Sequence, residues 1–352
     1  MRCLLTLVLV FLAAADVSAA QVGAGEGPRR LGNWTDPDLG GAIVEGIATR
    51  DFLWLRGVSR TVVRFDRRTG ERSRVAVDAV DLLADGPHLW ALLVLNENES
   101  TVRDLRDPTA HQQRVSFLGT PLALFATSGR PGVLTDVNVL VPSGHRWSRR
   151  GLAGSLQSGG HVSALTGDAL FVGYNLGEWG GGLRRIDVAT GTVSFVQEPG
   201  ETVCSGRLDP ECAPIVGIVP DDAGAGCVLV GTSLAHISIR RGEVLRVCDD
   251  QVSSVFRDPL PVEPNSIINR PGQSWPFDSL TQTRDGWVAV GQERFARSRQ
   301  GTVMIEAVPD LRAWAGLRIS DPADELIFAE AACCWGSDAL VRYRVVAIPI
   351  VP

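Results

Sequence analysis

The chain contains no lysine, and all 34 of its basic residues are arginine. Without lysine, a protein cannot form a Schiff base with pyridoxal phosphate or with a carbonyl substrate. A P-loop is excluded as well, because the lysine of that loop reaches the nucleotide phosphates. The formal net charge is −6. Non-specific nucleic-acid binding needs clustered positive charge, so nucleic acid is not an expected partner.

The sequence also lacks a long apolar run beyond its first residues. In "MRCLLTLVLVFLAAADVSAA", Arg2 precedes an apolar run from Leu4 to Ala15, and the small residues Ser18, Ala19 and Ala20 follow it. This order is typical of a secretory signal peptide. The run is shorter than the roughly 20 residues of a spanning helix. We therefore predict a signal peptide over 1–20, no transmembrane segment, and a periplasmic or secreted protein.

Cysteine is sparse, and an even number of cysteines follows the predicted signal peptide. An even number of cysteines in an exported chain indicates disulfides. Proximity favours Cys204–Cys212, Cys227–Cys248 and an adjacent pair, Cys333–Cys334, although other pairings remain open.

Motifs for metals and common hydrolases are missing. The five histidines form no H-E-x-x-H pattern. The acidic, glycine-bearing stretches Asp36–Gly41 and Pro220–Gly226 lack the ligand spacing of a calcium loop. No G-x-S-x-G sequence marks a nucleophile elbow. We predict neither a metal site nor a cofactor.

A short repeat recurs along most of the chain. A polar or glycine-bearing turn leads into a short apolar strand, and most of these strands follow another apolar strand. The unit is about four strands long, as in a blade of a β-propeller. The seven instances are "RDFLWLRG" from Arg50, "GPHLWALL" from Gly86, "RPGVLTDV" from Arg130, "GDALFVGY" from Gly167, "AGCVLVGT" from Ala225, "RDGWVAVG" from Arg284 and "ADELIFAE" from Ala323.

Two hairpins sharpen this interpretation. "TVVRFDRRTGERSRVAV" (61–77) and "LRRIDVATGTVSFV" (183–196) each contain an alternating strand, an Asp, a two-residue spacer, Thr-Gly and a second strand. The glycines stand where a hairpin needs positive φ. These hairpins resemble the blades of bacterial propellers of the streptogramin-lyase-like and quinoprotein-like kind. The resemblance implies a propeller fold, and neither activity is carried over.

The sequence therefore predicts an all-β protein, a seven-bladed β-propeller, with six blades plus extra strands as the alternative. The predicted organisation is a signal peptide (1–20), an N-terminal extension (21–40) and a single propeller domain (41–352). Trp54, Trp90 and Trp287 recur at matching places in three strands. We expect them to fill the space between blades.

The stretch "YNLGEWGGG" (174–182) is the first candidate site. It falls between the second and third strands of the fourth predicted blade. Asn175 and Glu178 are polar loop residues, and Trp179 could stack on a ligand, so we predict these three as ligand-binding residues. Glu178 is also a weak catalytic candidate. The alternative is a wide hairpin loop whose tryptophan packs on the neighbouring blade.

The second candidate is Cys333-Cys334-Trp335. A bond between adjacent cysteines closes a strained ring that could serve as a rigid platform for a ligand. The segment follows the second strand of the seventh predicted blade, so it is expected on the same face as "YNLGEWGGG". Alternatively, the two cysteines pair elsewhere or remain buried thiols.

Two classes of function follow from these patterns. The favoured hypothesis is a binding module for a glycan, a peptide or a protein partner, because no complete catalytic set is visible. The alternative is a lyase or hydrolase with its site at the channel mouth, using Glu178 beside the Cys333–Cys334 platform. An enzyme would need two or more ionisable groups within reach of one substrate atom.

Overall fold

The computed structural model describes residues 29–35, 39, 43–307, 319–320, 325–332 and 342–349, with short gaps within 43–307, of which 202–205 and 263–271 are the longest. The predicted signal peptide and the Cys333-Cys334-Trp335 segment lie outside the described residues. No helix in the described part of the chain is long and apolar enough to span a membrane.

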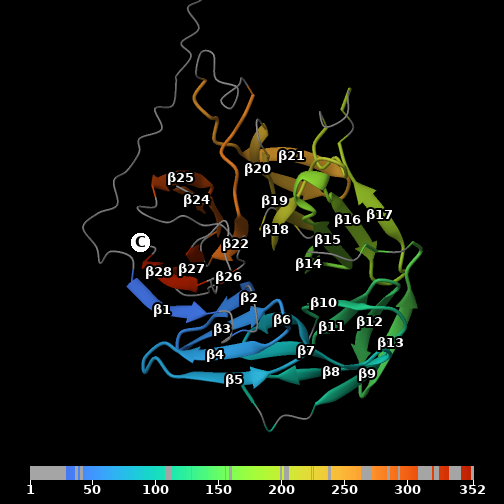
Figure 1. The fold of residues 1–352 in the computed structure, drawn as a ribbon. Helices are drawn as coiled ribbons and strands as arrows, with labels where there is room; N and C mark the ends of the chain where they lie inside the picture. Colours follow the sequence, from blue (N-terminus) through green and yellow to red (C-terminus); the bar gives the residue numbers. More distant parts are fainter. Residues whose placement is uncertain are drawn as a thin grey trace, which may run out of the picture.

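Within these ranges, six sheets of antiparallel strands are arranged around a centre (Figure 1). In each, four strands consecutive in the sequence pair in order, so each sheet is one blade. The first blade has β2 (Ile43–Ala48), β3 (Phe52–Gly57), β4 (Val62–Asp66) and β5 (Arg72–Ala76). The second has β6 (Ala79–Asp85), β7 (His88–Asn96), β8 (Glu99–Asp104) and β9 (Gln113–Ser116). The third has β10 (Pro121–Phe125), β11 (Gly132–Thr135), β12 (Asn138–Ser143) and β13 (Arg146–Gly151).

The remaining three blades repeat this order. The fourth has β14 (His161–Thr166), β15 (Ala169–Tyr174), β16 (Leu183–Asp187) and β17 (Val193–Val196). The fifth has β18 (Ile215–Pro220), β19 (Cys227–His236), β20 (Ile239–Cys248) and β21 (Gln251–Phe256). The sixth has β22 (Ser279–Thr283), β23 (Gly286–Val290), β24 (Arg294–Arg299) and β25 (Thr302–Ala307).

The expectation of seven blades is wrong, and the alternative of six blades plus extra strands is confirmed. The last repeat, "ADELIFAE", forms β27 (Glu325–Ala332), but β27 does not pair with the short strand before it. That strand, β26 (Ile319–Ser320), instead runs parallel to β2 of the first blade. β27 pairs with β28 (Arg342–Pro349), and β28 pairs with β1 (Arg29–Thr35). Both ends of the described chain therefore meet in one three-stranded sheet.

Apolar side chains fill the spaces between neighbouring blades. Each of five clusters of buried residues draws mainly on two consecutive blades, from the first and second to the fifth and sixth. Trp54, Trp90 and Trp287 are 1%, 7% and 4% exposed and belong to three of these clusters. Their predicted place in the core is confirmed. Burying such large side chains is the main source of the stability of the ring.

The Asp-x-x-Thr-Gly hairpins form the turns that their sequence predicts. Asp66 accepts hydrogen bonds from the backbone N–H groups of Arg68 and Thr69, each at 2.8 Å, which lower the pKa of its carboxyl. Asp187 accepts the Thr190 N–H in the same way. Gly70 and Gly191 have φ values of 77° and 79°, where a side chain would be strained. The motif therefore specifies a turn and not a ligand site.

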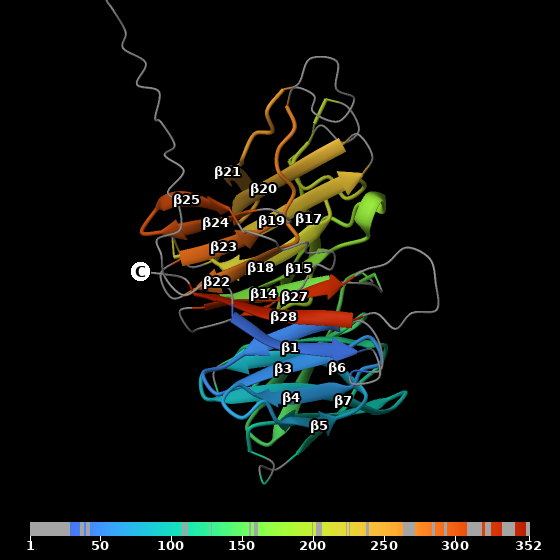
Figure 2. The same ribbon diagram turned by 60° about the vertical axis from the view of Figure 1, so that its left-hand side comes forward.

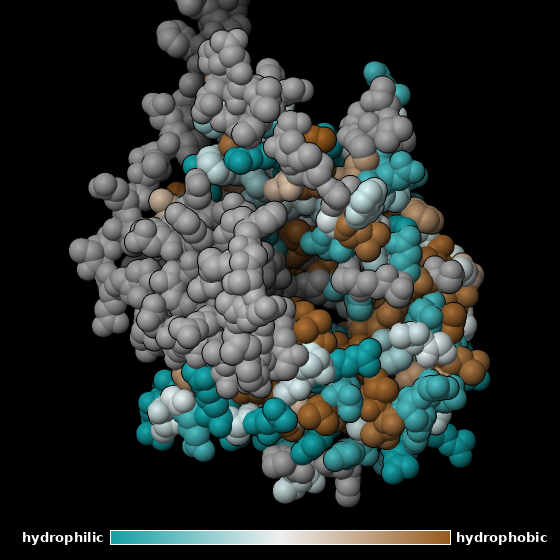
Figure 3. Space-filling view, viewed as in Figure 1, coloured by the Kyte–Doolittle hydropathy of each residue, from teal (hydrophilic) through white to brown (hydrophobic). Residues whose placement is uncertain are grey.

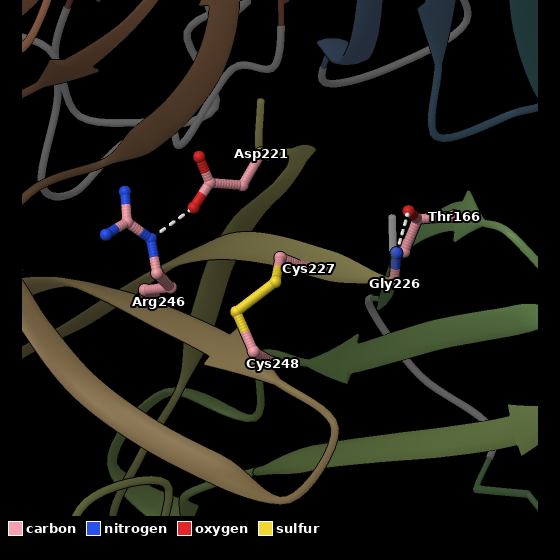
Figure 4. Close-up of a disulfide and its surroundings, with 6 residues drawn as sticks. All are labelled: Thr166, Asp221, Gly226, Cys227, Arg246 and Cys248. Atoms are coloured by element: carbon pink, nitrogen blue, oxygen red, sulfur yellow. Dashed lines mark hydrogen bonds and ion pairs between the residues drawn. A yellow bond between two sulfur atoms is a disulfide. The ribbon is translucent and has the colours of Figure 1, made fainter. Parts of the chain in front are cut away.

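One predicted disulfide, Cys227–Cys248, is confirmed (Figure 4). The two cysteines face each other across β19 and β20. Close by, Arg246 of β20 forms an ion pair with Asp221, and the Gly226 N–H donates to Thr166 of the fourth blade. The disulfide thus lies beside a contact between two blades. Cys212 is also disulfide-bonded, and its predicted partner, Cys204, lies outside the described residues.

Removing the Cys227–Cys248 bond is expected to destabilise the fold. The bond closes a segment with a sequence separation of 21 residues. Constraint of such a loop in the unfolded chain is worth about 3 kcal/mol. The double variant Cys227→Ala/Cys248→Ala should lose about that free energy of unfolding in urea titrations. A double variant as stable as the oxidised parent would contradict this expectation.

Candidate functional site

The direction of the strands divides the loops between two faces. Consecutive strands of a blade are antiparallel, so every second connection emerges on the same side. We call "insert face" the side with the connections between second and third strands and between one blade and the next. The other connections form the "turn face". Figure 1 looks onto the insert face, and in Figure 2 this face lies to the right, with the arrowhead of β19 pointing towards it.

Exposed hydrophobic side chains gather on the insert face. Ten large hydrophobic residues of the described chain are exposed. Phe195 lies within the edge strand β17, and the other nine lie in or beside connections of the insert face. Figure 3 shows hydrophobic side chains on this face around a central hollow. The nine are Val44, Val58, Val77, Leu95, Leu118, Val137, Trp179, Ile239 and Val262.

The predicted site loop connects β15 and β16 of the fourth blade, and so lies on the insert face. Asn175 is exposed, and its Oδ1 accepts the Gly177 N–H at 3.0 Å. A short 3-10 helix, η1 (Gly177–Trp179), follows. Trp179 is 76% exposed, the highest value among the exposed large hydrophobic residues. The expected alternative, in which this tryptophan packs on the neighbouring blade, is therefore wrong.

The structure of this loop requires glycine at its three consecutive glycine positions. Gly181 donates its N–H to the carbonyl of Pro210 at 2.7 Å, and Gly182 donates to that of Ala213 at 2.9 Å. A Cβ on Gly180 would lie 2.3 Å from the Glu211 backbone. All three also have positive φ. The loop is thus packed against the insert between β17 and β18, and this close approach requires glycine.

Buried aromatic and cationic groups hold the base of the loop. Tyr174 is fully buried, and burial raises the pKa of its phenol to about 12. The Arg184 guanidinium lies 5.8 Å from the Tyr174 ring centroid and 3.6 Å from that of Phe195. Burial lowers the pKa of Arg184, although it stays a cation. Cation–π contacts therefore stabilise the loop from below.

The other predicted site residues keep their roles as predictions. Glu178 belongs to η1, but its side chain is not among those described. Cys333, Cys334 and Trp335 lie outside the described residues. The adjacent disulfide and the catalytic role of Glu178 are therefore untested.

A polar cavity of about 350 Å³ opens beside the loop, and sequence reasoning missed it. Its walls come from the insert before β18, from the ends of β19 and β20, and from the insert before β22. Cys212 and Ala213 form part of the first wall, next to the residues that the glycine loop contacts. The charged lining residues are Glu198, Arg207, Arg241, Glu243 and Arg257.

A second cavity, of about 380 Å³, lies in the central channel. The first strands of all six blades line it, and its charged lining residues are Glu45 and Asp81. Arg56 donates to Glu45 at 2.6 Å, and the Leu124 N–H donates to Asp81 at 2.6 Å. Burial and the neighbouring Glu45 raise the pKa of Asp81 well above its usual range. The bond from Leu124 to Asp81 joins the third blade to the second, and the contact between Asp81 and Glu45 joins the second blade to the first. The cluster therefore has a structural function.

The described residues contain no group of three or more His, Cys, Asp or Glu side chains that could hold a metal ion. The channel carboxyl groups are engaged with Arg56 and with the backbone of a neighbouring blade. The polar cavity on the insert face, and not the channel cavity, adjoins the exposed tryptophan loop.

The glycine loop can be tested by substitution. Gly181→Ala places a Cβ 2.0 Å from the Tyr174 carbonyl oxygen, at a φ of 144°. We expect a loss of about 2 kcal/mol or more in the free energy of unfolding. Gly177→Ala is the matched control, because its φ is also positive but none of the described neighbouring atoms lies within 4 Å of the added Cβ. Equal losses in the two variants, measured in urea, would show that the close approach of Gly181 to the Tyr174 backbone is unimportant.

Asp278, at the end of the insert before β22, predicts a pH dependence of stability. Its Oδ2 is buried without a hydrogen-bond partner among the described residues, and burial raises its pKa to about 7. The folded state then holds a proton that the unfolded state releases near pH 4, so stability falls as the pH rises from about 4 to about 7. The cost above pH 7 is at most about 4 kcal/mol.

Asp278→Asn should remove this slope and raise the free energy of unfolding at pH 7.5. Urea titrations from pH 4.5 to pH 8 measure both effects. An Asn variant with the same pH slope as the parent would refute the assignment to Asp278.

Comparison with known proteins supports the fold alone and identifies no activity. No known family model and no curated protein matches the chain. The β-propeller domain of Cps50 (Swd1) from Myceliophteria thermophila has a TM-score of 0.54 and 14% identity, over 91% of this chain and 99% of that one. YCF48 bound to D1 peptide has a TM-score of 0.54 and 10% identity, over 95% and 98% of the two chains.

A third solved structure is the extracellular domain of the one component system BT4673 from B. thetaiotaomicron. Its TM-score is 0.50 and its identity is 11%, over 91% of this chain and 40% of that one. At these identities, structural likeness shows the fold alone. The chain is therefore a β-propeller, and its likeness to streptogramin-lyase-like repeats stays a prediction.

Proposed function

We propose that this protein is a binding module that holds a segment of a partner protein on its insert face. The observation that carries the proposal is the distribution of exposed large hydrophobic side chains, since nine of the ten in the described part of the chain lie on that face. Scattered exposed hydrophobic residues are normal on a protein surface, whereas their concentration on one side marks an interaction surface.

Trp179 is the expected anchor of the partner segment. Tryptophan is enriched among the residues that dominate binding energy at protein interfaces. The backbone around it is fixed by two hydrogen bonds to the neighbouring insert and by the buried Tyr174–Arg184 contact. A preorganised anchor loses little conformational entropy on binding. Such a large exposed side chain on a fixed loop is better suited to binding than to stabilising the fold.

The structural likeness supports a peptide as the bound element. YCF48, a propeller of similar size and the same fold, is bound to the D1 peptide in its solved structure. We infer peptide binding for this chain as well, because its own insert face carries exposed hydrophobic residues.

Binding is proposed to take place outside the cytoplasm. The N-terminal pattern of the sequence is that of a signal peptide, and the Cys227–Cys248 disulfide suits an oxidising compartment. The BT4673 domain with the propeller fold is described as extracellular. The periplasm or the extracellular space is therefore the proposed location.

A peptide library tests the proposal directly. The purified chain would be panned against phage displaying random twelve-residue peptides, and the affinities of enriched sequences would be measured. The triple variant Leu118→Ser/Val137→Ser/Trp179→Ala should bind these peptides at least tenfold more weakly, because hydrophobic anchors dominate such affinities. The matched control is Arg68→Ser/Asp250→Ser, which changes two exposed residues of the turn face.

Two results would contradict the proposed function. One is the absence of any enriched peptide for the parent chain. The other is binding that the insert-face variant retains and the turn-face variant loses.

A further inference from the structure

The polar cavity on the insert face is built from three segments far apart in the sequence. The insert before β18 contributes Arg207, the hairpin of β19 and β20 contributes Arg241 and Glu243, and the insert before β22 contributes Arg257. Its volume of about 350 Å³ is at the lower end for binding pockets. The space suits one or two side chains or a chain terminus rather than a large ligand.

The two acidic side chains of the cavity already have a cation. Arg207 Nη1 lies 2.6 Å from Glu198 Oε2, and its Nε lies 3.5 Å from Glu243 Oε1. The hydrogen bond that Arg207 donates to Glu198, together with the charges of both carboxylates, raises the pKa of Arg207. One guanidinium therefore holds both carboxylates, and these three residues form a connected wall.

Two further arginines make the summed charge of the described lining residues positive. Among the described lining residues are three guanidinium groups and two carboxylates, so these side chains sum to +1 in a chain of net charge −6. Arg257 is exposed and donates from Nη2 to the carbonyl of Gly272, which holds it at the rim. Arg241 is partly buried on β20. The cavity is thus a local cationic site on an acidic protein.

The cavity is also joined to the anchor loop. The segment Pro210–Ala213 accepts hydrogen bonds from Gly181 and Gly182, while its residues Cys212 and Ala213 line the cavity. The loop that carries Trp179 and the cavity thus share one segment of the chain. This contact couples the apolar anchor to a polar pocket.

We propose that this cavity receives a carboxylate of the bound partner segment, with Arg241 and Arg257 as its cationic partners. The planar guanidinium matches a carboxylate with two parallel hydrogen bonds, which gives direction as well as attraction. The carboxylate belongs to an Asp or Glu side chain or to a chain terminus. This inference rests on the proposed function, since it names the chemistry of the partner on the same face.

Three short synthetic probes separate these sources. N-acetyl-Leu-Glu-Leu-amide carries only a side-chain carboxylate, N-acetyl-Leu-Leu-Leu with a free C-terminus carries only a terminal one, and N-acetyl-Leu-Gln-Leu-amide carries neither. Each would be titrated into the full ¹⁵N-labelled chain. The backbone resonances of Thr232 and Ser233, which line the cavity, and the arginine side-chain resonances would report binding.

At least one carboxylate probe should bind about tenfold more tightly than the uncharged probe, because hydrogen bonds to charged groups are worth that much. The double variant Arg241→Ala/Arg257→Ala should lose this preference. The matched control Arg146→Ala/Arg149→Ala removes two exposed arginines of β13, on the third blade, and should keep it.

Equal affinity for all three probes, no binding of any carboxylate probe, or a preference that survives in the double variant would overturn the inference. The two proposals fail separately. If library peptides depend on Trp179 but the probes show no carboxylate preference, the proposed function stands without this pocket. If the probes depend on the arginines but no library peptide binds, the pocket remains a carboxylate site and the binding module is refuted.

Discussion

Antiparallel pairing of consecutive strands is the constraint on which the rest of this structure depends. In each of the six blades, four consecutive strands pair in order, and each reverses the direction of the one before it. Connections therefore alternate between the two sides of the ring. Polar Asp-x-x-Thr-Gly turns lie on one side, while the long inserts and exposed hydrophobic residues lie on the other. The separation of turns and inserts onto opposite faces therefore follows from the pairing of neighbouring strands.

Because packing between blades stabilises the ring, the exposed residues of the insert face are available for binding. Buried clusters between consecutive blades, with Trp54, Trp90 and Trp287 among them, supply the hydrophobic stabilisation. The Asp81–Glu45–Arg56 contacts in the channel add polar links between blades. Most residues of these clusters lie in strands, so the exposed parts of the loops can vary and carry function.

Much of this architecture could be predicted from local sequence. The second strands of the six blades, the turn chemistry at Asp66 and Asp187, and the Cys227–Cys248 bond all depend on residues near one another in the chain. The pairing of β26 with β2 and of β1 with β28 joins segments almost a whole chain apart. Strand patterns do not encode such partners, so the number of blades was overestimated.

The candidate site shows the same limit. "YNLGEWGGG" was recognisable as an unusual loop, but its exposure of Trp179 depends on the insert that its glycines contact. The arginine cavity needs Arg207, Arg241 and Arg257 from three separate segments, and no spacing in the sequence relates them. Only the ring brings them together.

Hydrogen–deuterium exchange of the chain with and without a library-selected peptide tests the central claim that the insert face binds the partner. The account predicts slower exchange at 175–182 and at the insert-face end of the β19–β20 hairpin, with unchanged exchange in the turns at 66–71 and 187–192. Protection confined to those turns would place the binding surface on the opposite face and contradict the account.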